Sequence, residues 1–244
     1  MCLLRYSPLI QGGMELKNIY EKLSEASLEI GALRLNVKNP FLWASGYYMP
    51  VYNDNRLFLQ NREYRRMITK TFASIIKKNR INPEAVAGTS TAGIPHAALL
   101  ADKLDLPLTY VRNKPKDHGL GNRIEGLDAE RGYEGRRVVL IEDLISTGGS
   151  SIAALKAVRE AGGKIEYCLS IFTYGLSKAE EEFSSLTPQC RAISILSYDK
   201  LIHTAEKSGY ISKDDVKSLE EWRKSPFDWG SNYGFPPKTK GGQP

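Results

Sequence analysis

Arg137-Val-Val-Leu-Ile-Glu-Asp-Leu-Ile-Ser-Thr-Gly-Gly-Ser150 is the stretch that decides the fold of this chain of 244 residues. Its apolar start predicts a buried strand that ends in two adjacent carboxylates, Glu142 and Asp143. A turn of small residues, 146–150, follows and opens a predicted helix. This order of strand, acid pair, turn and helix is typical of an α/β protein with a ligand at the carboxyl end of the strand.

The residue types in this stretch suit a phosphorylated sugar. Glycines let the backbone approach a ligand, and free N–H groups with hydroxyls at a helix N-terminus bind phosphate. Carboxylates at a strand end accept hydrogen bonds from a ribose diol or hold hydrated Mg²⁺. The alternative is ordinary α/β connectivity, since a Gly-rich turn alone is a weak signal. The stretch has no Walker lysine and no G-x-G-x-x-G spacing, so the commoner nucleotide loops do not fit.

Short apolar runs alternate with helical patterns along the rest of the chain, which predicts a parallel sheet with right-handed crossovers. The residues 226–244 lack periodicity and are predicted to be a surface-laid or disordered extension. We expect strands at 85–87, 108–111, 138–141, 167–173 and 192–196, and helices at 15–30, 62–79, 95–104, 151–161, 177–183, 198–208 and 213–224.

The composition indicates one soluble core. Hydrophobic residues make up 41% of the chain, no apolar run approaches membrane-spanning length, and residues 1–13 do not form a secretory signal. The cysteines Cys2, Cys168 and Cys190 show neither a disulfide framework nor metal-ligand spacing, which favours a reducing, cytoplasmic location. The net charge of +6 is interleaved with acids along the chain, so neither nucleic acid nor a membrane is an expected partner.

Four segments together resemble type I phosphoribosyltransferases, and in particular the orotate phosphoribosyltransferases. The acid pair and its turn resemble their phosphoribosyl-diphosphate (PRPP) signature. Residues 112–126, which contain Lys116-Asp-His-Gly119, resemble their catalytic loop, and Gly88-Thr-Ser-Thr-Ala-Gly93 resembles their diphosphate loop. Phe41-Leu-Trp-Ala-Ser-Gly46 with Asp54-Asn-Arg56 resembles their orotate-side segment.

The resemblance covers about residues 14–212, an orotate phosphoribosyltransferase domain flanked by an N-terminal extension, 1–13, and a C-terminal helix and extension, 213–244. It implies the type I phosphoribosyltransferase fold, a central parallel β-sheet flanked by helices with a small N-terminal hood subdomain and a mobile catalytic loop. It also implies transfer of the ribose 5-phosphate group of PRPP to orotate, giving orotidine 5′-phosphate and diphosphate in de novo pyrimidine (UMP) biosynthesis. Mg²⁺ is the implied cofactor, and a homodimer with a site shared between subunits is the implied assembly.

The resemblance assigns roles to single residues. Lys116, His118 and Arg112 are the implied catalytic residues and also contact PRPP, while Asp143 is expected to hold Mg²⁺ directly or through water. Orotate is expected to contact Ser146, Arg56 and Ser45. The further implied PRPP contacts are Thr91, Ala92, Glu142, Asp143, Leu144, Ile145, Ser146, Thr147, Gly148, Gly149 and Ser150.

Some positions leave alternatives open. Asn113, Ala44 and Ala92 stand where family members often or sometimes carry a lysine. Arg56 suits the orotate carboxylate, but a surface salt bridge is the alternative interpretation. Trp43 and Tyr52 either stack on the pyrimidine or pack in the core. The histidines His96 and His203 are interpreted as structural rather than catalytic.

Two other functions compete with this interpretation. A purine-base phosphoribosyltransferase would share the phosphate turn, but the Lys116-Asp-His-Gly119 and Asp54-Asn-Arg56 segments argue against it. A PRPP-binding regulator without turnover would keep the turn as well. The intact catalytic loop and the lack of a DNA-binding motif in the sequence argue against that class.

Overall fold

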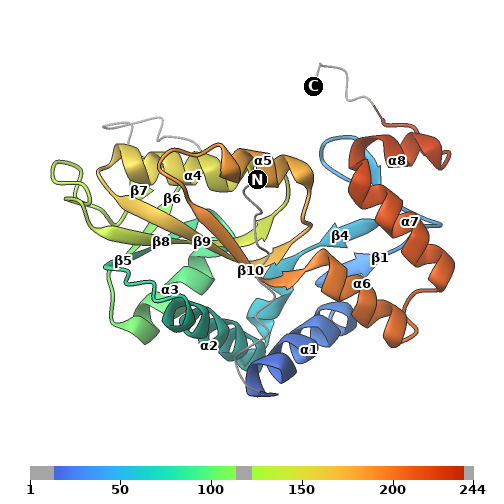
Figure 1. Ribbon diagram of the computed structural model, residues 1–244, viewed down its shortest axis with the longest axis horizontal. Coiled ribbons are helices and arrows are strands. Elements are labelled where there is room, and N and C mark those ends of the chain that lie inside the picture. The colour runs from blue at the N-terminus through green and yellow to red at the C-terminus, as the bar shows by residue number, and fades with distance from the viewer. Residues whose placement is uncertain (1–13, 114–122, 239–244) are drawn as a thin grey trace.

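The computed structural model of the protein describes residues 14–113 and 123–238. Within these residues a six-stranded sheet has the order β10-β9-β8-β5-β6-β7, and all neighbours are parallel except β7, which pairs antiparallel with β6 (Figure 1). The mostly parallel sheet confirms the predicted fold class. Its strands are β5 (Ala85–Thr89), β6 (Leu108–Val111), β7 (Ile124–Glu125), β8 (Arg137–Ile145), β9 (Lys164–Thr173) and β10 (Arg191–Ser197).

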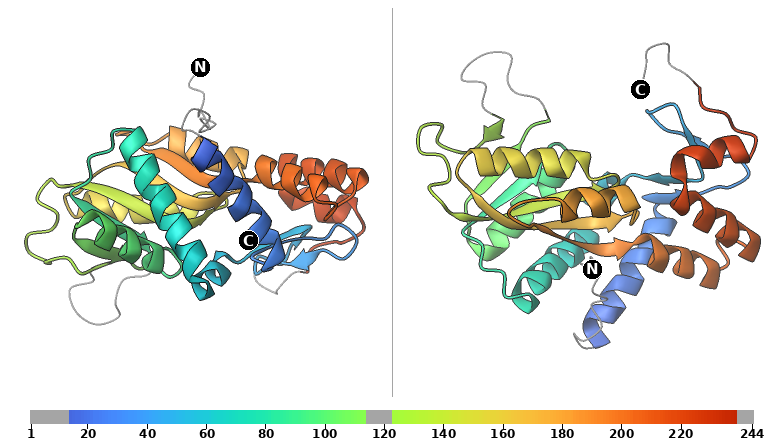
Figure 2. Two further views of the ribbon diagram at one scale, coloured as in Figure 1. Left: turned by 90° about the horizontal axis from the view of Figure 1, so that it is seen from below. Right: turned by 45° about the horizontal axis from the view of Figure 1, so that its top comes forward.

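Helices cover both faces of this sheet, which is why its central strands are continuous apolar runs rather than alternating ones. The helices α2 (Arg62–Lys78) and α3 (Gly93–Leu104) lie on one face, and α4 (Gly149–Glu160) and α5 (Ser177–Ser184) lie on the other (Figures 1 and 2). The sheet therefore separates two buried apolar clusters. Helix α1 (Met14–Glu29) packs against α2, α6 and β10.

The hood was expected to come from the N-terminal part of the chain, but it is built from segments near both ends of the chain and lies at one end of the sheet (Figure 1). Its N-terminal part pairs β1 (Leu33–Leu35) with β4 (Val51–Asn53) and β2 (Phe41–Leu42) with β3 (Tyr48–Met49), all antiparallel. The short helix η1 (Asn55–Gln60) leads from the hood into α2. The C-terminal helices α6 (Tyr198–Lys207), α7 (Lys213–Lys224) and α8 (Pro226–Asn232) complete the hood.

Helix α8 differs from the prediction of a surface-laid or disordered extension after residue 225. Trp229 is 2% exposed, stacks on Tyr233 at 4.8 Å between ring centroids and donates from Nε1 to Ser218 Oγ at 3.1 Å. The chain then returns to the β2–β3 hairpin, where the Lys238 N–H donates to the Gly46 carbonyl at 2.9 Å. A few aromatic anchors fix this segment, and such anchors leave no periodic pattern in the sequence.

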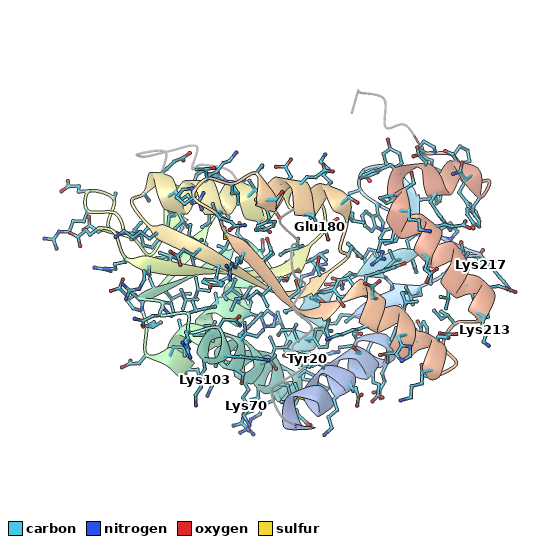
Figure 3. The ribbon with its side chains drawn as sticks, viewed as in Figure 1. Tyr20, Lys70, Lys103, Glu180, Lys213 and Lys217 are labelled. Carbon is cyan, nitrogen blue, oxygen red and sulfur yellow. The ribbon has the colours of Figure 1, made fainter. Side chains whose placement is uncertain are left out.

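Charge is spread over distant parts of the surface. Figure 3 shows the exposed Lys70 of α2 and Lys103 of α3 at the lower margin of the molecule and the exposed Lys213 and Lys217 of α7 at its right margin. In the part of the chain that the structure describes, no helix is both long and apolar enough to cross a membrane.

Candidate active site

Glu142 and Asp143 are neighbours in β8, but their side chains have different surroundings. Glu142 is 4% exposed, and its Oε1 accepts hydrogen bonds from Thr89 Oγ1 at 2.6 Å and from the Asp143 N–H at 3.1 Å. Its Oε2 accepts from Ser150 Oγ at 3.3 Å and Ser151 Oγ at 3.0 Å. Asp143 is partly exposed. The Glu142 carboxylate therefore ties β5 and the first turn of α4 to β8, and Asp143 is the more accessible acid.

Burial shifts the titration of both acids. The pKa of Glu142 rises to about 7, mainly because the carboxylate is buried and further because of the adjacent Asp143 charge, while the bond from Thr89 lowers it. The pKa of Asp143 is also raised, mainly by burial, and the Arg56 charge opposes this shift. A bound cation lowers the pKa of a nearby carboxyl. The pair is therefore suited to a ligand that brings positive charge.

Two helices begin beside this acid pair. Helices α3 and α4 follow the adjacent parallel strands β5 and β8, and among the described residues neither N-cap position, Ala92 or Gly148, supplies a capping side chain. The first N–H groups of a helix have no partner inside it and carry its partial positive charge. The structure therefore has two neighbouring sites that suit anions, one at the N-terminus of the helix that follows each strand.

Glycines allow these close approaches. An added Cβ at Gly93 would lie 2.5 Å from the Ile141 carbonyl oxygen and 2.5 Å from Thr89 Oγ1, so only glycine lets α3 start this close to β8. Gly148 has a φ of 88°, the left-handed region that glycine enters without strain. In the predicted diphosphate loop, residues 88–93, Thr91 is exposed and Ala92 is half-buried.

The turn after the acids places its residues differently. Strand β8 runs beyond the predicted end to Ile145, because β9 continues beside it and pairs Ile145 with Thr173. Ile145 is 2% exposed, and the half-buried Leu144 packs in the opposite cluster. Ser146 and Thr147 are partly exposed, and Gly149 and Ser150 are exposed.

The predicted catalytic loop leaves and rejoins the sheet at one place. The Arg112 N–H donates to the Arg123 carbonyl at 2.8 Å, and Arg112 Nη1 lies 3.3 Å from Glu125 Oε1. The Asn113 N–H donates to Ser90 Oγ at 3.1 Å. The described ends of the catalytic loop are thus held beside the predicted diphosphate loop, residues 88–93.

Lys116 and His118, the central residues of that loop, lie outside the described residues. Their roles stay predictions. Arg112 is the implied catalytic residue that the structure does describe, and its guanidinium contacts Glu125 of the edge strand β7.

On the base side, Arg56 is held by Asp54. Arg56 Nε and Nη2 donate to the two Asp54 carboxylate oxygens at 2.6 and 2.9 Å, and the Arg56 side chain is 64% exposed. Arg56 thus forms the surface salt bridge that was the alternative to orotate binding. Its guanidinium is still exposed enough to contact a ligand. The bond from Arg56 lowers the pKa of Asp54. Ser45 and Ala44 are exposed in the β2–β3 turn.

The aromatic residues of the hood have packing roles. Trp43 donates from Nε1 to the Val51 carbonyl at 2.9 Å and lies 5.7 Å from Tyr174 and 6.3 Å from Trp222 between ring centroids. Tyr52 packs against Phe41 at 5.8 Å. Trp43 therefore packs against the core, whereas Tyr52 is partly exposed and belongs to neither buried cluster, so both interpretations of Tyr52 stay open.

Three side chains of the site received no role from the sequence. Thr89 and Ser151 bind the Glu142 carboxylate, and Asn55 donates from Nδ2 to the Asp143 carbonyl at 2.7 Å. A signal existed for Thr89, a small polar residue at the end of an apolar strand. Asn55 belongs to the Asp54-Asn-Arg56 segment, but nothing in the sequence signals its contact with Asp143, because the two residues are 88 positions apart along the chain.

Comparisons with known proteins place the chain among related sequences. The phosphoribosyl transferase domain family matches residues 58–213. An orotate phosphoribosyltransferase from Listeria monocytogenes is 45% identical over 213 residues, which cover 87% of this chain and 99% of that protein. One from Bacillus subtilis is 45% identical over 220 residues, which cover 89% of this chain and 98% of that protein.

Among solved structures, the orotate phosphoribosyltransferase from Aeropyrum pernix has a TM-score of 0.63 and 27% identity. That match covers 78% of this chain and 99% of the other chain.

Proposed function

The chain belongs to the orotate phosphoribosyltransferase family, and we propose that it transfers the ribose 5-phosphate group of PRPP to orotate, releasing diphosphate, in the de novo synthesis of UMP. One arrangement carries the proposal: an acid pair flanked by two helix N-termini without capping side chains among the described residues. Two anion sites on either side of a diol acceptor match the 5′-phosphate, the ribose hydroxyls and the diphosphate of PRPP.

The 5′-phosphate binds the turn Ser146–Ser150 and the first turn of α4, with the backbone of Leu144 and Ile145 leading into it. Its negative charge suits the helix N-terminus, and Thr147 adds a partly exposed hydroxyl. Gly148 and Gly149 add no side chain that would keep the phosphate from the backbone.

The ribose hydroxyls face the acid pair. Asp143, the more accessible acid, accepts them directly or through hydrated Mg²⁺, and Glu142 holds the surrounding loops through its four hydrogen bonds. Mg²⁺ typically takes one or two protein carboxylates and completes its shell with waters and substrate phosphates, so Asp143 fits that need. When bound, Mg²⁺ offsets the charge of the diphosphate.

The diphosphate is the leaving group, and it gains negative charge as its bond to ribose C1 breaks. Backbone N–H groups at Thr91 and Ala92 and the Arg112 guanidinium stabilise that charge from the described side of the site. Lys116 and His118 of the loop supply further cations and close the site to water.

Orotate binds on the hood side. The exposed Arg56 pairs with its carboxylate, because a guanidinium matches a carboxylate in two parallel hydrogen bonds. Ser45 and Ser146 contact the ring from the hairpin turn and the phosphate turn. Asp54 restricts the Arg56 side chain before orotate arrives.

The active form is a homodimer in which the catalytic loop of one subunit reaches the site of the other. Its compartment is the cytoplasm, and the free buried thiols of Cys168 and Cys190 support a reducing location. Both statements extend the resemblance to the orotate phosphoribosyltransferases.

A base-specificity assay tests the proposed substrate. The protein is mixed with PRPP, Mg²⁺ and one base at a time, and nucleotide formation is followed with orotate, uracil, adenine and hypoxanthine. We expect orotate to be used with the highest kcat/KM. Preferential use of adenine or hypoxanthine would overturn the proposal in favour of a purine-base enzyme.

A further inference from the structure

Asn55 connects the hood to the sheet through a buried amide. Asn55 is 1% exposed, and its Nδ2 donates to the Asp143 carbonyl at 2.7 Å. Its Oδ1 accepts a hydrogen bond from Asn53 Nδ2 at 3.1 Å. Since Asn53 ends β4 and Asp143 lies in β8, one side chain bridges two separate sheets.

The neighbours of Asn55 in sequence belong to the base side of the site. Arg56, which is paired with Asp54, is the residue proposed to bind orotate. The Asp54 N–H donates to the Ala32 carbonyl at 2.7 Å. Asp143, the partner of Asn55, belongs to the ribose side. Asn55 thus lies between the two halves of the site and contacts the backbone of one of them.

We propose that Asn55 is a positioning residue that sets the distance between the base side and the ribose side, acting through the backbone of Asp143. This inference rests on the proposed function. The reaction joins a ring nitrogen of orotate to ribose C1, so the two atoms must be held at a reactive distance of roughly 3–3.5 Å. A buried hydrogen bond of this kind is strong in a low-dielectric interior and restrains both partners.

The proposal separates binding from turnover. PRPP contacts the sheet side, where Asp143 is held independently of the hood by the pairing of its neighbours with β9 and by the bond from its N–H to Glu142. The affinity for PRPP should therefore depend little on where the hood lies. Turnover requires orotate and PRPP to be aligned, and a small misplacement of reacting groups costs up to about a hundredfold in rate. Loss of the Asn55 bridge should therefore lower kcat and leave the binding of PRPP unchanged.

Asn55→Leu tests this, because leucine has the same branched shape as asparagine and no hydrogen-bonding group. We expect kcat with orotate to fall roughly ten- to hundredfold. We expect the Kd of PRPP with Mg²⁺, measured by calorimetry without orotate, to change by less than about twofold, since sheet-side contacts remain. The control is Asn79→Leu, which removes a 2.9 Å amide-to-carbonyl bond to Ile75 at the end of α2, and it should keep the kcat of the unchanged protein.

Asn53→Ala is the second variant, because it keeps Asn55 but removes the bond that orients its amide. It should lower kcat several-fold with unchanged PRPP affinity, and it decides the question if Asn55→Leu does not fold. An unchanged kcat in the folded variants, or an equal loss of PRPP affinity and kcat, would overturn the positioning role while leaving the proposed function intact. An unchanged protein that makes no nucleotide from orotate would instead overturn the proposed function, and this inference with it.

Discussion

Thr89 Oγ1 donates a 2.6 Å hydrogen bond to Glu142 Oε1, and both side chains are buried. The bond holds the end of β5 against the strand that carries the acid pair. We expect Thr89→Val, which keeps the shape but loses the donor, to lower the free energy of unfolding by about 1.5–3 kcal/mol, because the acceptor is a charged group at pH 8. Urea denaturation at pH 8 measures this.

Thr109→Val is the matched control for that variant. Thr109 is buried in β6, and its hydroxyl forms a 2.7 Å hydrogen bond with the neutral Tyr133 hydroxyl. Its loss should cost only about 1 kcal/mol. A Thr89→Val variant as stable as the unchanged protein would show that the Thr89 bond does not hold Glu142.

The raised pKa of Glu142 predicts a loss of stability with rising pH. Its ordinary pKa of 4.5 rises to about 7 in the folded protein, so between these values the folded chain keeps a proton that the unfolded chain releases. This contribution is complete below about pH 4.5 and is lost as pH rises through about 7.

The unchanged protein should therefore lose stability relative to Glu142→Gln as the pH rises from 5 to 8, because glutamine does not titrate. Over this range the difference in free energy of unfolding should change by on the order of 3 kcal/mol in favour of the variant. Denaturation of both proteins across this range checks it. A stability difference that stays constant from pH 5 to pH 8 would contradict the raised pKa.

His96 predicts the opposite trend. It is 1% exposed in α3, its Nδ1 has no hydrogen-bond partner among the described residues, and burial lowers its pKa from 6.5 to about 4. Burying the neutral His96 imidazole contributes stability that is fully present above pH 6.5 and is lost as the pH falls through about 4. His96→Leu should flatten the fall in melting temperature between pH 6.5 and pH 4. The exposed His203 provides the control, since His203→Leu should leave that slope unchanged.

The catalytic loop predicts complementation between two inactive variants. Lys116→Ala should lower kcat roughly a hundred- to thousandfold, because a cation on the departing diphosphate is lost. If the loop acts across the dimer, subunits with Lys116→Ala mixed with subunits with Asp143→Asn form hybrids that hold one intact site. Activity should then reappear after mixing. No recovery, despite subunit exchange shown by mass spectrometry, would place Lys116 in the site of its own subunit.

The long elements of the fold were predictable because their patterns are local. The apolar run before Glu142 predicted β8, and the pattern over 213–224 matches α7 at both ends. The two- and three-residue strands of the hood were not predicted, because a segment this short cannot show an alternating apolar pattern. Strand β8 continues through the acids because of its pairing with β9, which a single segment does not reveal.

The site was predictable where residue types carry the chemistry. The acids, the glycines and the hydroxyls of the turn lie together at the end of β8, as their order along the chain predicts. The sequence did not show that Glu142 faces inward toward Thr89 and Ser151, since both acids look alike in a sequence. The role of Asn55 depends on a contact between distant parts of the chain.

Product formation from orotate is the most direct test of the central claim. The protein is mixed with orotate, PRPP and Mg²⁺, and the products are identified by chromatography. We predict that one orotidine 5′-phosphate and one diphosphate form per PRPP consumed, that removing Mg²⁺ stops the reaction, and that Asp143→Asn slows it strongly. Stoichiometric binding of PRPP without nucleotide from any base would contradict the claim and identify a PRPP-responsive regulator instead.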